Sequence, residues 1–244
     1  MALTLAASGC STAPARRPPI KVVLVDASVS TLSGPVRSDY EDAGREVVAS
    51  CSGGGALLVY PVTSNTQASS YAARMVAFPA YDPIDENEDQ FNSDLGKSQR
   101  VAADDMRKVL NFKDDSQGTD LLWACQKAAD YFNGEQYRDA QEKDLFILTD
   151  GLQQSPHLDV TSVNLTPARI KGIVGELKAD GDLPDLHNVT VWMVGPGADP
   201  YHQTSPEKLA QVRRFWLAYF AACGARLSPD RYGTTLQNFP PSSE

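Results

Sequence analysis

The stretch Lys21-Val22-Val23-Leu24-Val25-Asp26-Ala27-Ser28-Val29-Ser30 joins an apolar run to three oxygen-bearing side chains at alternate positions. The unbroken valine and leucine run predicts a strand covered on both faces, as in a parallel sheet. Asp26, Ser28 and Ser30 follow where that strand ends. Two interpretations are open at this point: the segment is a turn, or it is half of a metal site whose other half lies elsewhere in the chain.

Further apolar strands alternate with amphipathic helices along the chain. Strands are predicted at 21–26, 56–62, 74–78, 145–150 and 189–195, the third antiparallel to the second, with a short edge strand at 225–228. Helices are predicted at 39–50, 97–112, 120–133, 166–181 and 205–224. This alternation predicts a Rossmann-like, doubly wound α/β fold, with a mostly parallel sheet of about six strands and helices on both faces.

Length and composition limit the number of domains and the class of partner. The 244 residues suit one α/β domain with extensions, and 42% apolar residues suffice for a core. We assign the domain to 21–227, with an irregular insertion at about 63–97, and a flexible tail to 228–244. The acidic segment 82–89 lacks EF-hand spacing and is predicted to be a solvated loop. A net charge of −9 disfavours nucleic-acid binding.

The first twenty residues resemble a lipoprotein signal followed by a tether. Small residues precede Cys10, the residue that would be lipidated, and alanine, serine and proline follow it. The segment lacks a basic start, and its apolar stretch is shorter than the usual length of about 7–15 residues. Two interpretations stay open: a lipidated Cys10 with a true start upstream of Met1, or an N-terminal segment with an incidental cysteine. The first predicts the cell envelope, periplasm or exterior, and the second the cytoplasm.

The remaining cysteines give no sign of a metal site. Cys51, Cys125 and Cys223 form no C-x-x-C pair, so a zinc site or a thioredoxin-type motif has no support. Cys125 and Cys223 fall on apolar helix faces, which favours buried free thiols. One disulfide among the three is open if the protein is exported.

Oxygen-bearing side chains stand at the ends of two predicted strands and at the start of a helix. Asp26, Ser28 and Ser30 follow the first strand, Asp150 ends another, and Thr119 opens a helix. In open α/β sheets, ligands bind outside the carboxyl ends of the strands. Residues two apart in an extended segment face the same side, so the first three can face one ion. Hydroxyls, carboxylates and water are the ligands that Mg²⁺ prefers, with Mn²⁺ or Ca²⁺ as alternatives.

Together these segments resemble the metal-ion-dependent adhesion site (MIDAS) of the von Willebrand factor type A (VWA) domain. The matching pieces are Asp26-x-Ser28-x-Ser30, Thr119 in a Gly-Thr step before a helix, and Thr149-Asp150-Gly151 after a strand. They agree with that site in type, order and approximate separation, and the resemblance covers roughly residues 21–227. The segment from about 61 to 118 is long and irregular for this family.

The resemblance implies a role for each residue. Ser28, Ser30 and Thr119 would bind the metal directly, with Thr119 acting through water in a state that is not ready for ligand. Asp26 and Asp150 would act through coordinated waters. A Glu or Asp carboxylate of a partner protein would complete the coordination, so the implied protein is a binding module and not an enzyme. The extra acid Asp120 either caps its helix or tunes the charge of the site.

Two other functions fit parts of the pattern. A magnesium-dependent phosphohydrolase of the haloacid dehalogenase type also begins with a strand that ends in Asp, but it needs a second Asp where this chain has Ser28. A VWA-like domain that no longer binds metal is the second alternative. The chain contains no Gly-x-x-x-x-Gly-Lys-Ser/Thr for nucleotide hydrolysis and no Gly-x-Ser-x-Gly for a serine hydrolase.

Overall fold

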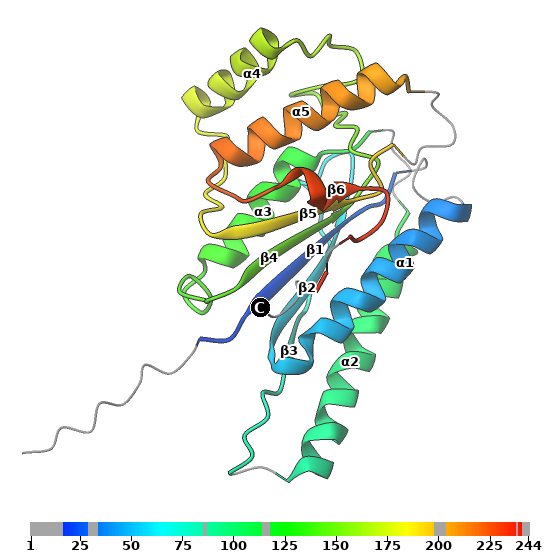
Figure 1. Cartoon of the computed structure of the whole chain (residues 1–244), viewed down its shortest axis with the longest axis vertical. Helices are drawn as coiled ribbons and strands as arrows, with labels where there is room; N and C mark the ends of the chain where they lie inside the picture. The colour runs from blue at the N-terminus through cyan, green and yellow to red at the C-terminus, as the bar shows by residue number, and fades with distance from the viewer. Residues whose placement is uncertain are drawn as a thin grey trace, which may run out of the picture.

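Six strands form a single sheet in the order β3-β2-β1-β4-β5-β6 (Figure 1). The structure is a computed structural model, and it describes residues 17–28, 34–84, 87–113, 118–197, 204–237 and 239–240. The strands are β1 (Ile20–Asp26), β2 (Gly55–Val62), β3 (Met75–Phe78), β4 (Lys143–Leu148), β5 (Val189–Val194) and β6 (Tyr232–Gly233). All neighbours pair in parallel except β2 and β3, which are antiparallel. The predicted α/β class, mostly parallel sheet and antiparallel third strand are confirmed.

Helices cover both faces of this sheet (Figure 1). The helices α1 (Gly34–Ala49) and α2 (Glu88–Leu110) pack on one face. The other face carries α3 (Leu121–Asn133), α4 (Pro167–Asp180) and α5 (Pro206–Ala222). The central strand shows why the sheet is covered twice: Val22 and Leu24 join the core under α3 and α5, whereas Val23 and Val25 join the core under α1. Side chains alternate in direction along a strand, so an unbroken apolar run needs cover on both sides.

The sequence also encodes where α4 and α5 begin. Thr166 caps α4 by accepting a hydrogen bond from the Arg169 amide at 3.2 Å, and Ser205 caps α5 in the same way from the Lys208 amide at 3.2 Å. A proline follows each cap at the first helical position, where its missing amide costs no hydrogen bond. These two helix starts agree with the prediction.

Three regions differ from the predicted elements. The helix α1 begins at Gly34 instead of near residue 39. The helix α2 begins at Glu88 instead of near 97, so the end of the predicted acidic loop is the first turn of a helix. Asn87 caps this helix, and Glu88 and Asp89 suit its positive end. The predicted edge strand 225–228 is only an isolated bridge from Arg226 to Thr190, and the sixth strand is β6. Residues 229–233, which composition assigns to a flexible tail, form a 3-10 helix (Pro229–Arg231) and this strand.

The three described cysteines are free thiols in the core. Cys51, Cys125 and Cys223 are all buried, as predicted for the last two. Burial raises the pKa of the Cys51 thiol to about 11 and that of Cys223 to about 12. These thiols are therefore protonated near neutral pH and poorly reactive.

Candidate functional site

The carboxyl ends of β1 and β4 meet where the strand order reverses. Along the chain, β1 is followed by β2 and β3 on one side of it, whereas β4, β5 and β6 lie on the other. Asp26 is the last residue of β1, and Thr149 and Asp150 directly follow β4. A doubly wound sheet forms its ligand crevice at such a switch point. The topology thus brings two segments of the predicted site to one rim.

Asp26 is the centre of the hydrogen bonds at this rim. Its Oδ1 accepts the Ser28 amide at 2.9 Å and faces the Thr119 hydroxyl at 3.4 Å. Its Oδ2 accepts the Thr149 hydroxyl at 2.8 Å. Asp26, Thr119 and Thr149 are all buried, and Ser28 is partly exposed. One nearby amide and the hydroxyls of two distant segments therefore converge on one carboxylate.

Gly118 allows the loop that carries Thr119 to approach the backbone of Gln154 closely. Its φ of +123° is one that L side chains rarely adopt, and a Cβ there would lie 2.6 Å from the Gln154 carbonyl oxygen. Thr119 then exchanges two backbone hydrogen bonds with Gln154, at 2.9 and 2.8 Å, and Asp120 donates its amide to the Thr63 carbonyl. The loop is fixed on both sides before α3 begins.

Hydrogen bonds with buried groups fix the turn after β4. Asp150 is buried, and its Oδ1 accepts the Leu152 amide at 2.8 Å. Gly151 has a φ of +84°, which lets the chain turn sharply after Asp150. The Trp216 indole of α5 donates to the Gly151 carbonyl at 2.9 Å, and the Gly151 amide donates to the Thr149 hydroxyl at 3.1 Å. The position of Asp150 therefore depends on the packing of α5.

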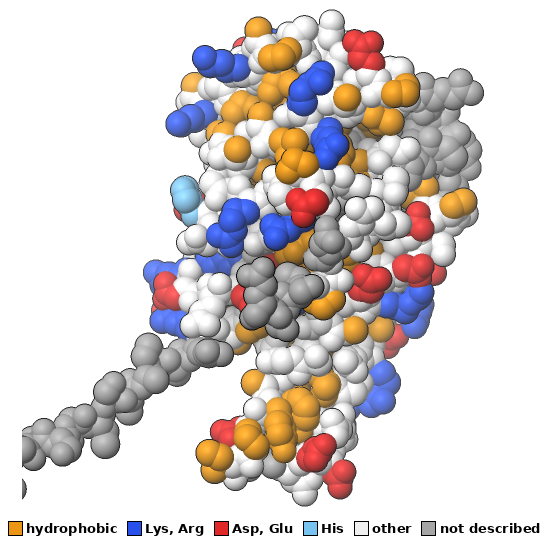
Figure 2. All heavy atoms as spheres, in the orientation of Figure 1, with side chains coloured by type: hydrophobic (Ala, Val, Ile, Leu, Met, Phe, Trp, Pro, Cys, Tyr) orange, Lys and Arg blue, Asp and Glu red, His pale blue; other side chains and the backbone are white. Residues whose placement is uncertain are grey.

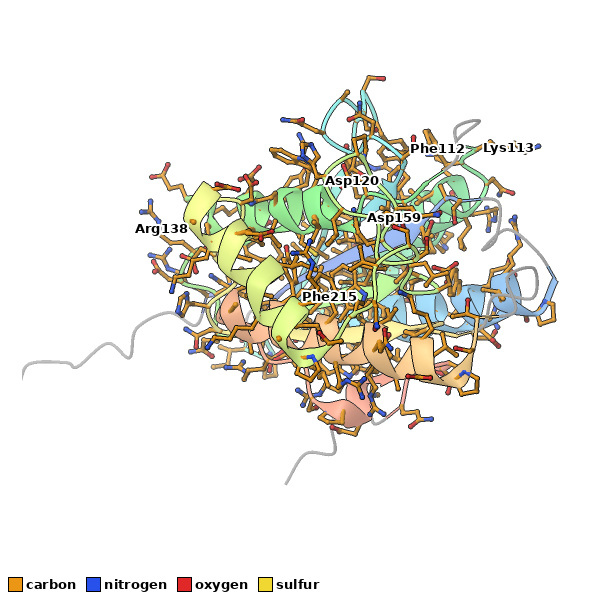
Figure 3. All side chains as sticks on the ribbon, turned by 90° about the horizontal axis from the view of Figure 1, so that it is seen from above. Phe112, Lys113, Asp120, Arg138, Asp159 and Phe215 are labelled. Atoms are coloured by element: carbon orange, nitrogen blue, oxygen red, sulfur yellow. The ribbon has the colours of Figure 1, made fainter. Side chains whose placement is uncertain are left out.

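Asp120 caps α3. Its side chain accepts the Trp123 amide at 3.5 Å, and Gln153 accepts the amides of Leu121 and Leu122 at 2.7 and 3.2 Å. Together they accept hydrogen bonds from the first-turn amides, which have no partner within the helix itself. Figure 3 shows Asp120 and Asp159 at this rim, where Gln154 bridges to Thr119 and to Asp159. Of the two roles predicted for Asp120, helix capping is the one seen.

Burial sets the electrostatics of the rim. It raises the pKa of Asp26, and the hydrogen bonds from Ser28, Thr149 and Thr119 partly offset the rise. Burial also raises the pKa of the Tyr40 phenol, and the negative charges of Asp26 and Asp150 add to it. The Tyr40 hydroxyl is buried and has no hydrogen-bond partner among the described residues. The charges of both acids thus act on one phenol of α1.

The donor set has the chemistry of a hard cation site. It consists of carboxylate and hydroxyl oxygens, which suit Mg²⁺, Mn²⁺ or Ca²⁺. In the part of the chain that the structure describes, no three His, Cys, Asp or Glu side chains form a metal-binding group, and this rim has two acids and several hydroxyls. Ser30 and Cys10 lie outside the described residues. The assignment of the five metal ligands stays a prediction.

Sequence reasoning missed three residues of the rim. Thr149 belongs to a quoted motif but was not expected to hold Asp26, whereas Gln153 and Tyr40 have no local signal at all. A threonine directly before the acid, with a glutamine four positions after that threonine, is too common a pattern to be informative. Only the contacts show these roles.

Neither protein-family models nor curated protein sequences match this chain. Among solved structures, it is similar to a von Willebrand factor type A protein from Catenulispora acidiphila, at 17% identity and a TM-score of 0.46. It is also similar to the pilus adhesin SpaC from Lactobacillus rhamnosus GG (14%, TM-score 0.48) and to manganese-loaded Plasmodium vivax TRAP protein (15%, TM-score 0.43). The strand order itself confirms the predicted mostly parallel α/β sheet. Each of these three likenesses has a TM-score below 0.5, so the assignment to the VWA family stays a prediction.

These alignments cover most of this chain and part of the other proteins. They include 82%, 90% and 90% of this chain, but 37%, 28% and 69% of the three chains in the same order. The chain thus spans less than two fifths of the first two proteins. The ligands and partners of those proteins are therefore not assigned to this chain by the likeness. Of the described helices, none has both the length and the apolarity needed to cross a membrane.

Proposed function

We propose that the chain is a divalent-metal-dependent protein-binding module. Ser28, Ser30 and Thr119 hold a Mg²⁺ ion, or Mn²⁺ or Ca²⁺ in its place, and Asp26 and Asp150 act through coordinated waters. The observation that supports this most directly is the approach of the Thr119 hydroxyl to Asp26 at 3.4 Å, between segments 93 residues apart. Such a meeting of hard oxygen donors suits a single cation.

The proposed chemistry uses a cation that the protein neutralises incompletely. Hydroxyl ligands carry no charge, and Asp26 and Asp150 are already engaged by the Ser28 and Leu152 amides. When bound, the ion supplies positive charge at the rim. A Glu or Asp carboxylate of a partner protein is the ligand that best complements it. This use of the site is binding, and no group at the rim is assigned a catalytic step.

The direct test is partner capture with and without metal. The purified chain, incubated with a native membrane fraction in Mg²⁺, is expected to retain a partner that EDTA releases. Ser28→Ala removes one ligand and is expected to abolish capture. Ser52→Ala is the matched control, because Ser52 is exposed at the opposite end of the sheet. Capture that is unchanged by EDTA and by Ser28→Ala would refute the proposal and leave the VWA-like fold without metal as the explanation.

We also propose a location at the cell envelope, through lipidation of Cys10. Labelling of cells with a fatty-acid analogue is expected to mark the natural chain and not Cys10→Ser. The Cys10→Ser chain is expected to leave the membrane fraction. If the Cys10→Ser chain keeps both the label and the membrane association, lipidation at this residue is contradicted. The proposal of metal-dependent binding does not depend on that outcome.

A further inference from the structure

Acidic and apolar side chains are exposed together at one end of the molecule. Tyr81 and Ile84, in the turn between β3 and α2, are the large hydrophobic residues that the described chain leaves exposed, by 45% and 89%. The Tyr81 ring packs on Phe91 at 5.0 Å, so the turn is backed by α2. Asp82, Glu88 and Asp89 surround it and are exposed. We call Tyr81, Asp82, Ile84, Glu88 and Asp89 the acidic end.

The opposite end exposes a basic and apolar surface. Two hollows flank α5: one against β6, lined by Leu209, Arg213 and Leu217, and one against α4, lined by Lys171 and Val174. Arg214 lines both, and no Asp or Glu lines either. We call Lys171, Leu209, Arg213, Arg214 and Leu217 the basic face.

Lys171 and Arg214 of the basic face are exposed, and Arg213 is partly exposed. Among the described residues, none of Lys171, Arg213 and Arg214 forms an ion pair. Arg213 is already ordered, because it donates to the Pro229 carbonyl at 2.7 Å and lies over the Tyr232 ring. Such a surface is unusual in a chain of net charge −9, and it favours a partner that is acidic and apolar.

The acidic end has that chemistry. Figure 2 shows orange and red side chains gathered at the lower end. Over α4 and α5 at the upper end it shows orange and blue side chains with a few red ones. Figure 1 places the turn between β3 and α2 and the helix α5 at opposite ends of the longest dimension. We propose that the occupant of the basic face is the acidic end of a second copy of this chain, with Ile84 in a hollow beside α5 and the carboxylates on Arg214 and Lys171.

This contact is head-to-tail. Each copy uses two different surfaces. A pair of copies therefore still has one free acidic end and one free basic face. Association therefore continues into rings or open-ended assemblies instead of stopping at a symmetric dimer. We expect the contact to be weak and reversible, because one exposed turn of each copy is its acidic half. The metal site takes no part in it.

Sedimentation velocity of the full chain in EDTA tests the contact. The average mass of the natural chain is expected to rise with protein concentration and to fall with added salt, because the pairing charges are screened. Ile84→Asn and Arg214→Glu are each expected to weaken self-association at least 10-fold. Lys178→Glu, the same charge change at an exposed position outside both hollows, is expected to leave it unchanged.

Mixing the two variants gives the sharpest result. Ile84→Asn keeps the basic face and Arg214→Glu keeps the acidic end, so an equal mixture is expected to form complexes of two chains and nothing larger. A natural chain that stays monomeric up to about 1 mM, the weak limit of specific binding, would overturn the proposal. So would self-association that neither variant weakens, or a mixture that forms no two-chain complex. Circular dichroism verifies that both variants are folded.

Discussion

Two buried carboxylates at opposite ends of the sheet are satisfied in different ways. Asp144, near the start of β4, pairs with Lys21 of β1 at 3.2 Å, directly across the parallel strands. Asp26, at the end of β1, accepts hydrogen bonds from the Ser28 amide and from the hydroxyls of Thr119 and Thr149. Burial raises the pKa of both acids. At one end of the sheet the acid is paired with a fixed cation of the protein, and at the other it is held by an amide and two hydroxyls.

The difference separates a structural charge from a candidate binding charge. A lysine beside an acid neutralises it permanently and closes the position to other cations. Hydroxyls stabilise an acid by hydrogen bonds and remain able to bind a metal ion through their oxygen atoms. The same residue type therefore serves stability at the amino ends of the strands, whereas the carboxyl ends are suited to ligand binding.

Removing the fixed cation is expected to have the largest effect. Lys21→Met leaves Asp144 buried without its partner, which is expected to cost about 3–5 kcal/mol in the free energy of unfolding near neutral pH. Urea denaturation measures it. The double variant Lys21→Met/Asp144→Leu is expected to regain most of the loss, since an apolar pair needs no charge partner. A small loss in the single variant would show that the pair is not needed at that end.

The same variant gives a pH dependence of known sign. Lys21 lowers the pKa of Asp144 against the effect of burial, so its removal raises that pKa further. The folded state then binds the Asp144 proton at a higher pH than the unfolded state does. The destabilisation is complete above the raised pKa and diminishes as the pH falls through it. A loss that grows on acidification, relative to the natural chain, would contradict this.

Adding Mg²⁺ is expected to stabilise the protein through the site at Asp26 and not through the Lys21–Asp144 pair. Mg²⁺ at one hundred times its Kd is expected to stabilise the natural chain by about 2.7 kcal/mol. Thermal or urea unfolding with and without Mg²⁺ measures the increment. It is expected to vanish in Ser28→Ala and to persist in Ser52→Ala and in any folded variant of the Lys21–Asp144 pair. An increment that survives Ser28→Ala would place the ion elsewhere.

A substitution at Thr149 tests how far hydroxyls stabilise buried Asp26 in the way that Lys21 stabilises buried Asp144. Thr149→Val removes the donor to Asp26 Oδ2 and the acceptor of the Gly151 amide while keeping the shape. We expect a loss of about 1–3 kcal/mol in the free energy of unfolding, as for a buried charged group that loses a partner. Thr190→Val on β5, whose hydroxyl accepts from the exposed Arg226, is the control and is expected to cost less. Equal losses would mean that Asp26 does not depend on Thr149.

The smallest expected effect distinguishes the two roles of Asp120. As a helix cap, Asp120→Ala is expected to cost about 1 kcal/mol, whereas Asp120→Asn, which can still cap, is expected to cost a few tenths at most. Neither is expected to change the Mg²⁺ Kd by more than about 2-fold, since the cap faces α3. Calorimetric titration with Mg²⁺ checks this. A large loss of affinity in Asp120→Asn would instead show that this acid tunes the site.

Sequence periodicity predicted the elements with strong local signals. The unbroken apolar runs of β1 and β4 and the Thr-Pro and Ser-Pro starts of α4 and α5 lie where expected. The start of α2 and the strand β6 were missed for physical reasons. The first turns of α2 are polar and exposed, so they carry no apolar period, and β6 has two residues, too few for any pattern. Its place depends on pairing with Met193 and Val194.

By itself, the sequence determined the α/β class, the double cover of the sheet and the type of atoms at its rim, because these follow from apolar spacing and from side-chain chemistry. Only the tertiary structure decided that Thr119 and Thr149 face Asp26, that Asp120 caps α3, and that the exposed acidic end lies opposite the basic face. Those are contacts between segments far apart in the chain. No local pattern encodes them, since strand order and helix packing set which distant residues meet.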